Sequence, residues 1–278
     1  MAWYEGTMTN AAGQLVSILD AKLPLNSCWE IVDTPNTNER VYGHKTNGTR
    51  DFCVYVMDNQ ADYATVELWD DWDAVNHQGI GNSIIAVGTG NTLRIRKTAG
   101  AWGLRLTDNC FVFINRASGW AYYIGQTKRF DTNRNQPIIV AHTSYTNGTY
   151  YKQNPLGGIN GLSTTWGSIG IFWGVLYDSA GGVAKSCYPA GATTSFSSSH
   201  TTQNYGWWEL KTTAGTYYVI ESPVQDYDTP YLTFGLLDGV MALNGGNGLS
   251  NGDVINVEGV SWLVVRGSQQ AVSLVRMD

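Results

Sequence analysis

Three carboxylates close together, those of Asp70, Asp71 and Asp73, form the group in this sequence whose types and spacing best suit chemistry. Paired carboxylates beside an aromatic ring can hydrolyse glycosides, one acting as acid and the other as base or nucleophile. The three could also hold Ca²⁺, although the spacing of an EF-hand loop is missing. Adjacent residues of a strand point to opposite faces, however, and acidic clusters usually mark the start of a solvated loop. We therefore predict neither a catalytic residue nor a metal ligand here, and a depolymerase or cell-wall hydrolase using this cluster is the weaker hypothesis.

Neither the histidines nor the cysteines follow the spacing of a metal site. No two histidines stand three or four residues apart, and no two cysteines form a Cys-x-x-Cys pair. His142 follows an apolar run and could orient a site, but a packed histidine at a strand end is the commoner arrangement. Cys53 and Cys110 lie within apolar runs, which favours buried free thiols, although the sequence leaves disulfides open. Phosphate loops, dinucleotide fingerprints and the Gly-x-Ser-x-Gly elbow are also missing, so we expect no cofactor.

Aromatic residues near Asn and Asp form a second group that could bind a ligand. Their rings could stack on sugars or lie in a subunit interface. Packing across strands in the core is an equally good explanation for each of them. The candidates for an interface or for glycan stacking are Trp72, Tyr150, Tyr151, Trp166, Trp207 and Trp208.

The composition is poor in charge and rich in aromatic rings. Of the 278 residues, 43% are hydrophobic and only 14% are charged, against about 25% charged residues in an average protein. A net charge of −6 and an aromatic content of 12% argue against disorder. Interface cores are rich in aromatics and poor in Lys, Glu and Asp, so the composition suits a subunit that buries much of its surface against neighbours. A monomeric β protein with aromatic cross-strand pairs is the alternative.

Several binding partners are not expected from the sequence. The pI near 5.2 and the lack of a Lys/Arg cluster predict no direct binding to nucleic acid. The longest apolar runs, such as residues 138–141 and 263–265, are too short to cross a bilayer, so no membrane insertion is expected. Residues 1–6 contain neither a basic stretch nor an apolar signal segment. We expect a soluble chain that begins at or next to Met1 and is made in the cytoplasm without a signal peptide.

One helix and many strands should position these residues. Apolar residues at helical spacing between Leu15 and Leu23 predict a helix that Thr9 or Asn10 caps and that ends at Pro24 and Asn26. Two predicted strands, 40–44 and 51–57, flank Asn47-Gly48, a pair that tolerates the positive φ angles of a type I′ hairpin turn. Residues 70–91 are polar and rich in glycine, and a loop of that length usually contacts partners. Further strands are expected at 29–33, 63–69, 93–97, 103–106, 110–115, 120–125 and 138–141.

The second half differs in composition. Residues 144–202 are dominated by Gly, Ser, Thr, Asn and Tyr, and we expect a long loop there that contacts neighbouring proteins, with 195–200 exposed. Strands return at 207–210 and 217–220, and a final meander is expected at 253–257, 262–266 and 271–276. The sequence thus predicts a mainly β protein with antiparallel, sandwich-like sheets. A small α+β domain of residues 1–142 precedes a β-rich domain of residues 143–278.

Several segments of the chain combine turns and aromatic residues in a recognisable order. The C-terminal run Gly235-Leu236-Leu237-Asp238-Gly239-Val240, the segment 253–265 and the final 275–278 are similar to the ending of a family of tailed-bacteriophage virion structural proteins. Residues 1–7, the amphipathic helix and Trp29-Glu30-Ile31-Val32-Asp33 are similar to its opening. Residues 62–69 also resemble the family, residues 106–125 take the place of its central hairpin, and residues 144–202 match least.

The resemblance implies a non-enzymatic component of a phage particle, and it carries over no catalytic or ligand-binding residue. We expect the chain to assemble in multiple copies in the tail, baseplate or neck of the virion. Its partners would then be other phage structural proteins and further copies of itself. The alternative is a virion-associated adhesin that binds a host surface receptor or a glycan, and a head decoration protein is a lesser one.

Overall fold

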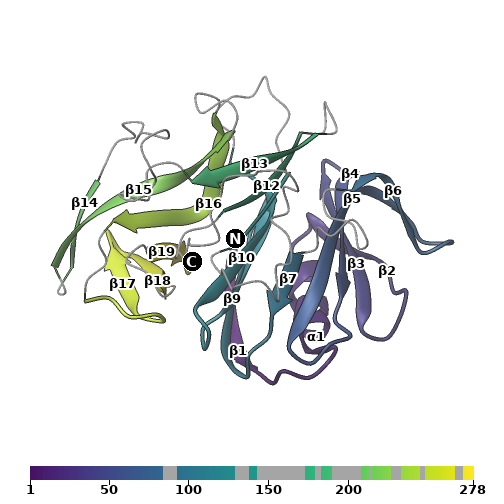
Figure 1. Ribbon diagram of the computed structural model, residues 1–278, viewed down its shortest axis with the longest axis horizontal. Coiled ribbons are helices and arrows are strands. Elements are labelled where there is room, and N and C mark those ends of the chain that lie inside the picture. The colour runs from purple at the N-terminus through teal and green to yellow at the C-terminus, as the bar shows by residue number, and fades with distance from the viewer. Residues whose placement is uncertain are drawn as a thin grey trace, which may run out of the picture.

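The part of the chain that the structure describes folds into antiparallel sheets and one short α-helix, so the prediction of a mainly β protein is confirmed (Figure 1). The computed structural model describes residues 1–83, 93–128, 138–142, 173–178, 183–189, 208–212, 215–226, 233–244, 248–266 and 272–278. Within them, one sheet has six strands and the other has thirteen. No helix in this part of the chain is long and apolar enough to cross a membrane.

The six-stranded sheet is a meander built from the first part of the chain. Its first four strands lie in chain order, and two further strands both pair with the fourth. The predicted hairpin is confirmed, because Asn47 and Gly48 both have positive φ angles, 51° and 83°. The strands are β2 (Trp29–Asp33), β3 (Glu39–Thr46), β4 (Thr49–Met57), β5 (Tyr63–Asp73), β6 (Gln78–Ser83) and β7 (Leu93–Arg96).

The prediction of a loop over residues 70–91 was wrong for the two strand segments that the structure describes there, 70–73 and 78–83. β5 continues through the acidic cluster to Asp73, and β6 then pairs back onto that end of β5. Polar and glycine residues are tolerated in β6 because it lies at the edge of the sheet. Glycine is also required there, since a Cβ on Gly79 would fall 2.0 Å from the ring of Trp69.

The helix α1 (Gln14–Lys22) starts later than the sequence indicated, and neither Thr9 nor Asn10 caps it. The carboxylate of Asp58, just after β4, instead accepts hydrogen bonds from the backbone N–H groups of Leu15 and Val16 at 2.7 and 3.3 Å. A cap that comes from 43 positions along the chain leaves no local sequence signal. A 3₁₀ turn, η1 (Leu23–Leu25), takes up the proline and continues the helix into the next connection.

The thirteen-stranded sheet joins both halves of the chain. Residue 142, the predicted domain boundary, falls between β11 and β12, which pair with each other. β12 and β13 lie within the segment predicted to be a long loop, so that prediction was wrong for these residues. In sheet order the strands are β1 (Ala2–Met8), β8 (Gly100–Leu106), β9 (Cys110–Asn115), β10 (Trp120–Gln126), β11 (Ile138–His142), β12 (Trp173–Asp178), β13 (Val183–Pro189), β15 (Gly215–Asp226), β16 (Thr233–Asn244), β19 (Val272–Arg276), β18 (Val260–Arg266) and β17 (Val254–Val257), with β14 (Trp208–Thr212) paired to β15.

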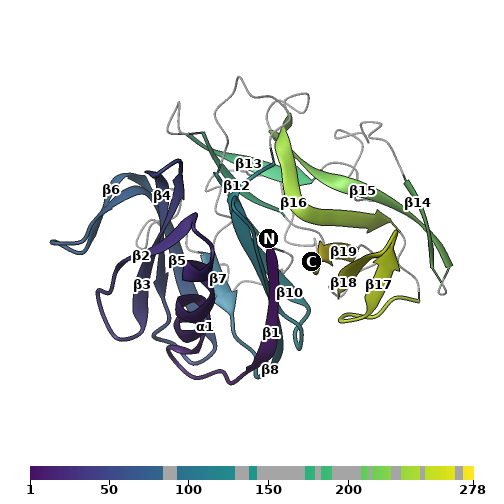
Figure 2. The ribbon, with the colours of Figure 1, turned by 180° about the vertical axis from the view of Figure 1, so that it is seen from behind.

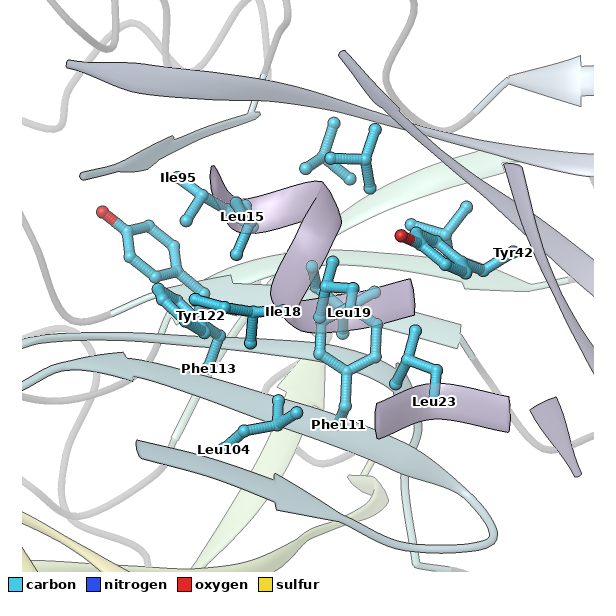
Figure 3. Close-up of a cluster of buried hydrophobic side chains, with 14 of the residues drawn as sticks. Leu15, Ile18, Leu19, Leu23, Tyr42, Ile95, Leu104, Phe111, Phe113 and Tyr122 are labelled. Carbon is cyan, nitrogen blue, oxygen red and sulfur yellow. The ribbon is translucent and has the colours of Figure 1, made fainter. Parts of the chain in front are cut away.

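Two hydrophobic clusters cover the two faces of β9 and β10. In the first, Leu15 and Leu19 of α1 lie between Tyr42 of the small sheet and Phe111 and Phe113 of β9 (Figure 3). In the second, the opposite face of β9 and β10 packs against β16, β18 and β19 of its own sheet. The thirteen-stranded sheet therefore curls until its distant strands meet. Figure 1 shows β9 and β10 as the central layer, with α1 and the small sheet on one side and the C-terminal strands on the other, and Figure 2 shows the same arrangement from behind.

Candidate functional site

Two carboxylates of the acidic cluster are held by other groups of the chain. Asp71 binds Arg50 at 2.6 Å, and Asp73 accepts hydrogen bonds from the backbone of Val75 and Asn76 within the β5–β6 turn. Burial tends to raise the pKa of Asp71, but the hydrogen bond from Arg50, the backbone hydrogen bond from Trp72 and the charge of Arg50 together lower it. Hydrogen bonds from Asn76 lower the pKa of Asp73. Neither group therefore suits a proton donor, which needs a raised pKa.

Of the six candidate aromatic residues, the structure describes the side chain of Trp72 alone. Trp72 is 5% exposed, its Nε1 donates to Asp33 Oδ2 at 2.7 Å, and its ring lies 4.9 Å from that of Tyr55. It is a packed core residue on the outer face of the small sheet, which corrects its prediction as a platform for sugars or partners. Trp208 lies in β14 opposite Val219. Tyr150, Tyr151, Trp166 and Trp207 lie outside the described residues.

The three cysteines whose side chains the structure describes are free thiols, and His44 is buried and hydrogen-bonded. Cys28, Cys53 and Cys110 are free thiols, and burial raises the pKa of Cys53 to about 12 and that of Cys110 to about 11. His44 is 1% exposed and lies between Asp51 Oδ2 at 2.9 Å and the carbonyl of Asp108 at 2.6 Å. Within the described ranges, no group of three or more His, Cys, Asp or Glu side chains is placed to hold a metal ion.

The sheet edges show a pattern that the sequence alone did not reveal. Among the described residues, β6 pairs with β5 only and β17 pairs with β18 only, so each has an unpaired outer edge there. Neither strand contains a charged residue or a proline, the usual devices that keep an edge from pairing with another chain. Each carries an exposed apolar side chain, Ile80 at 47% and Val254 at 50%.

The remaining exposed apolar residues follow the same pattern. In the described part of the chain, each large hydrophobic residue that is exposed lies on an edge strand or in the connection beside one. Single exposed hydrophobic residues are ordinary on a protein surface, but here they are concentrated at strand edges, the part of a sheet to which a further strand can be added. Besides Ile80 and Val254, they are Met1, Leu25, Ile31 and Val75.

A cavity of about 320 Å³ opens where the two ends of the chain meet. Figure 1 shows the N- and C-terminal ends close together, and Met1 and Arg276 both line the cavity. The turn between β8 and β9 forms one wall and β16 forms another. Arg105, in β8, connects the two walls, because its Nη1 donates a hydrogen bond to the carbonyl of Asp238 in β16 at 2.9 Å.

Sequence reasoning missed Arg105 as a site residue. The available signal was a single charge in the apolar segment Leu104-Arg105-Leu106, since a charge in a buried strand needs partners.

No protein-family model matches the chain, and no curated protein matches it.

Proposed function

We propose that the chain is a structural subunit of a tailed-phage virion, assembling in multiple copies in the tail, baseplate or neck. The observation that carries this proposal is the pair of uncharged edge strands, β6 and β17, each with an exposed apolar side chain. An unpaired edge offers a row of backbone N–H and C=O groups to a neighbouring strand, and apolar side chains add buried area to that contact. The charge-poor, aromatic-rich composition and the resemblance of both chain ends to virion proteins support the same role.

The two edges suit a head-to-tail contact between copies. Figures 1 and 2 place β6 and β17 at opposite ends of the molecule. Pairing of β6 in one copy with β17 in the next uses two different surfaces, and such contacts build a ring when the rotation between copies closes. Rings of identical subunits are the form that a neck, tail or baseplate requires.

The experiment measures oligomer size by light scattering and electron microscopy for the wild type and two edge variants, Ile80→Lys and Val254→Lys. The added charge should block strand addition, so each variant should lose the ring. Each variant keeps one competent edge. An equimolar mixture of the two should therefore form pairs that grow no further.

Ile31→Lys is the matched control, because Ile31 is 43% exposed on β2, an edge strand that already carries Glu30 and Asp33. It should leave the ring intact. A wild type that stays monomeric at every concentration would overturn assembly through these edges. Immunogold labelling of purified particles tests the virion assignment separately, and particles without the protein would overturn it.

A further inference from the structure

The cavity between the chain ends contains a buried guanidinium that the protein leaves short of acceptors. Arg105 is 1% exposed. Its Nη2 lies 3.3 Å from Asp238 Oδ1 and 2.9 Å from Met1 Sδ, and its buried Nε has no hydrogen-bond partner within the described structure. An arginine side chain presents five N–H donors, and a thioether is a weak acceptor. A buried charge is costly unless it is well hydrogen-bonded, so this shortage indicates a place for a further acceptor.

The backbone of β16 is shaped to keep this guanidinium in place. Gly239 has a φ of 68° and lies directly against it, since a Cβ there would fall 2.2 Å from Arg105 Cζ. A side chain at position 239 would push the guanidinium out of its position, and the positive φ is itself unfavourable for other residues. Glycine therefore permits the close approach that brings Arg105 to the wall of the cavity.

The side-chain charges around the cavity indicate what kind of acceptor would fit. The lining side chains include three cationic ones, Arg105, Lys128 and Arg276, the last of which also pairs with Asp278, and two acidic ones, Asp108 and Asp238. One excess positive charge among these side chains suits a monoanion better than a phosphate group, which carries close to two negative charges at neutral pH. A planar carboxylate matches the donor geometry of a guanidinium.

The acidic residues of the lining add a second requirement. Carboxylate oxygens accept hydrogen bonds and do not donate them, so Asp108 and Asp238 favour a ligand that also carries donors. Hydroxyl groups supply such donors without adding charge. The volume lies at the lower end of ligand sites, which span roughly 300–1,000 Å³, and therefore suits one small unit.

We propose that this cavity binds a hydroxylated monocarboxylate, the chemistry of a hexuronic acid unit in an acidic polysaccharide. Its carboxylate replaces the sulfur of Met1 as the acceptor for Arg105 Nη2. Lys128 adds attraction at the cavity mouth, and the hydroxyl groups bind the acidic residues. This binding site is separate from the sheet edges, so ligand binding can be tested independently of assembly.

The test is isothermal titration calorimetry of the full chain with glucuronate. Glucose, alanine, inorganic phosphate and a short acidic peptide serve as comparison ligands. Glucuronate should bind, and glucose should not, because glucose lacks the carboxylate charge.

The Lys128→Gln substitution, at an exposed position, should weaken glucuronate binding about threefold. The Lys22→Gln substitution, remote from the cavity lining, should have no effect. Arg105→Lys should weaken it roughly ten- to a hundredfold, because charge-assisted hydrogen bonds are lost.

Circular dichroism establishes whether the Arg105→Lys variant is folded. If that variant does not fold, the Lys128→Gln variant still tests the binding site. Absence of glucuronate binding at about 10 mM would mean that water alone fills the cavity, and it would overturn the proposal. Equal binding of alanine, phosphate or the acidic peptide would overturn the assignment of the ligand class. Binding that is unchanged in both cavity variants would overturn the assignment of the site.

Discussion

The carboxylate of Asp58 and the ammonium of Lys97 form an ion pair in which both side chains are 0% exposed. Lys97 Nζ also donates to the carbonyl oxygens of Ala11 and Gln60, at 2.8 and 2.6 Å. The other carboxylate oxygen of Asp58 caps α1. One buried pair thus connects the end of β4, the residues before α1 and the residue after β7. Burial raises the pKa of Asp58, against the opposing effect of Lys97.

Removal of either member of this pair should destabilise the fold strongly. Asp58→Ala leaves a buried ammonium without a counter-ion and α1 without its cap, and it should lower the free energy of unfolding by about 3–5 kcal/mol. Urea denaturation measures this change. The double variant Asp58→Ala with Lys97→Met should lose less than the two single variants together, because no unpaired charge remains. Additive losses would show that the two residues act separately.

The ionisation of Glu30 should make the folding stability depend on pH in the acidic range. The hydrogen bond from Lys45 lowers the pKa of Glu30, and Arg50 adds to the effect. A lowered pKa in the folded state contributes stability above the unfolded pKa, about 4.3, which is lost as the pH falls through the lower folded value. Melting temperatures between pH 6 and 3 should therefore fall less steeply for Glu30→Gln than for the wild type. Parallel curves would contradict a role for this group.

The thiols should differ in their reactivity in the native state. Burial raises the pKa of Cys53 to about 12 and that of Cys110 to about 11, so both remain protonated at pH 8 and are shielded from reagents. Cys28 is half-buried and should react first, although burial raises its pKa too. In a Cys187→Ser background, a disulfide reagent should label one thiol natively and three after unfolding. Rapid native labelling of Cys53 would contradict its burial.

Trp29 should anchor the β8–β9 turn to the small sheet. Its Nε1 donates to the carbonyl of Thr107 at 3.1 Å from a 2%-exposed side chain, and its ring packs edge-on against Phe111. Trp29→Phe keeps an aromatic ring but leaves that carbonyl without its donor, at a cost of about 1–3 kcal/mol. Chemical denaturation checks the value. Trp3→Phe, whose indole donates only to the exposed Glu5, is the control and should change stability little.

The sequence by itself determined those elements whose signals lie within a few residues. The β2 strand, from Trp29 to Asp33, and the hairpin at Asn47-Gly48 follow from alternation and from residues that tolerate positive φ. The continuous apolar run from Cys110 to Ile114 predicted a strand as well. The candidate site was not predictable in the same way, because Arg105 and Asp238 meet only in the folded chain, 133 positions apart.

The tertiary structure alone decided which groups meet over long distances. Asp58 replaced the local caps Thr9 and Asn10, because a buried carboxylate near Lys97 was already positioned at the helix start. The curled sheet brought β16 onto the second face of β9, which explains why that strand is apolar at every position from 110 to 114. Local periodicity reports on one residue and its near neighbours, whereas edges, ion pairs and cavities depend on how distant strands pair. The local strands and the hairpin are therefore readable in the sequence, while the free edges and the cavity between the chain ends are properties of the fold.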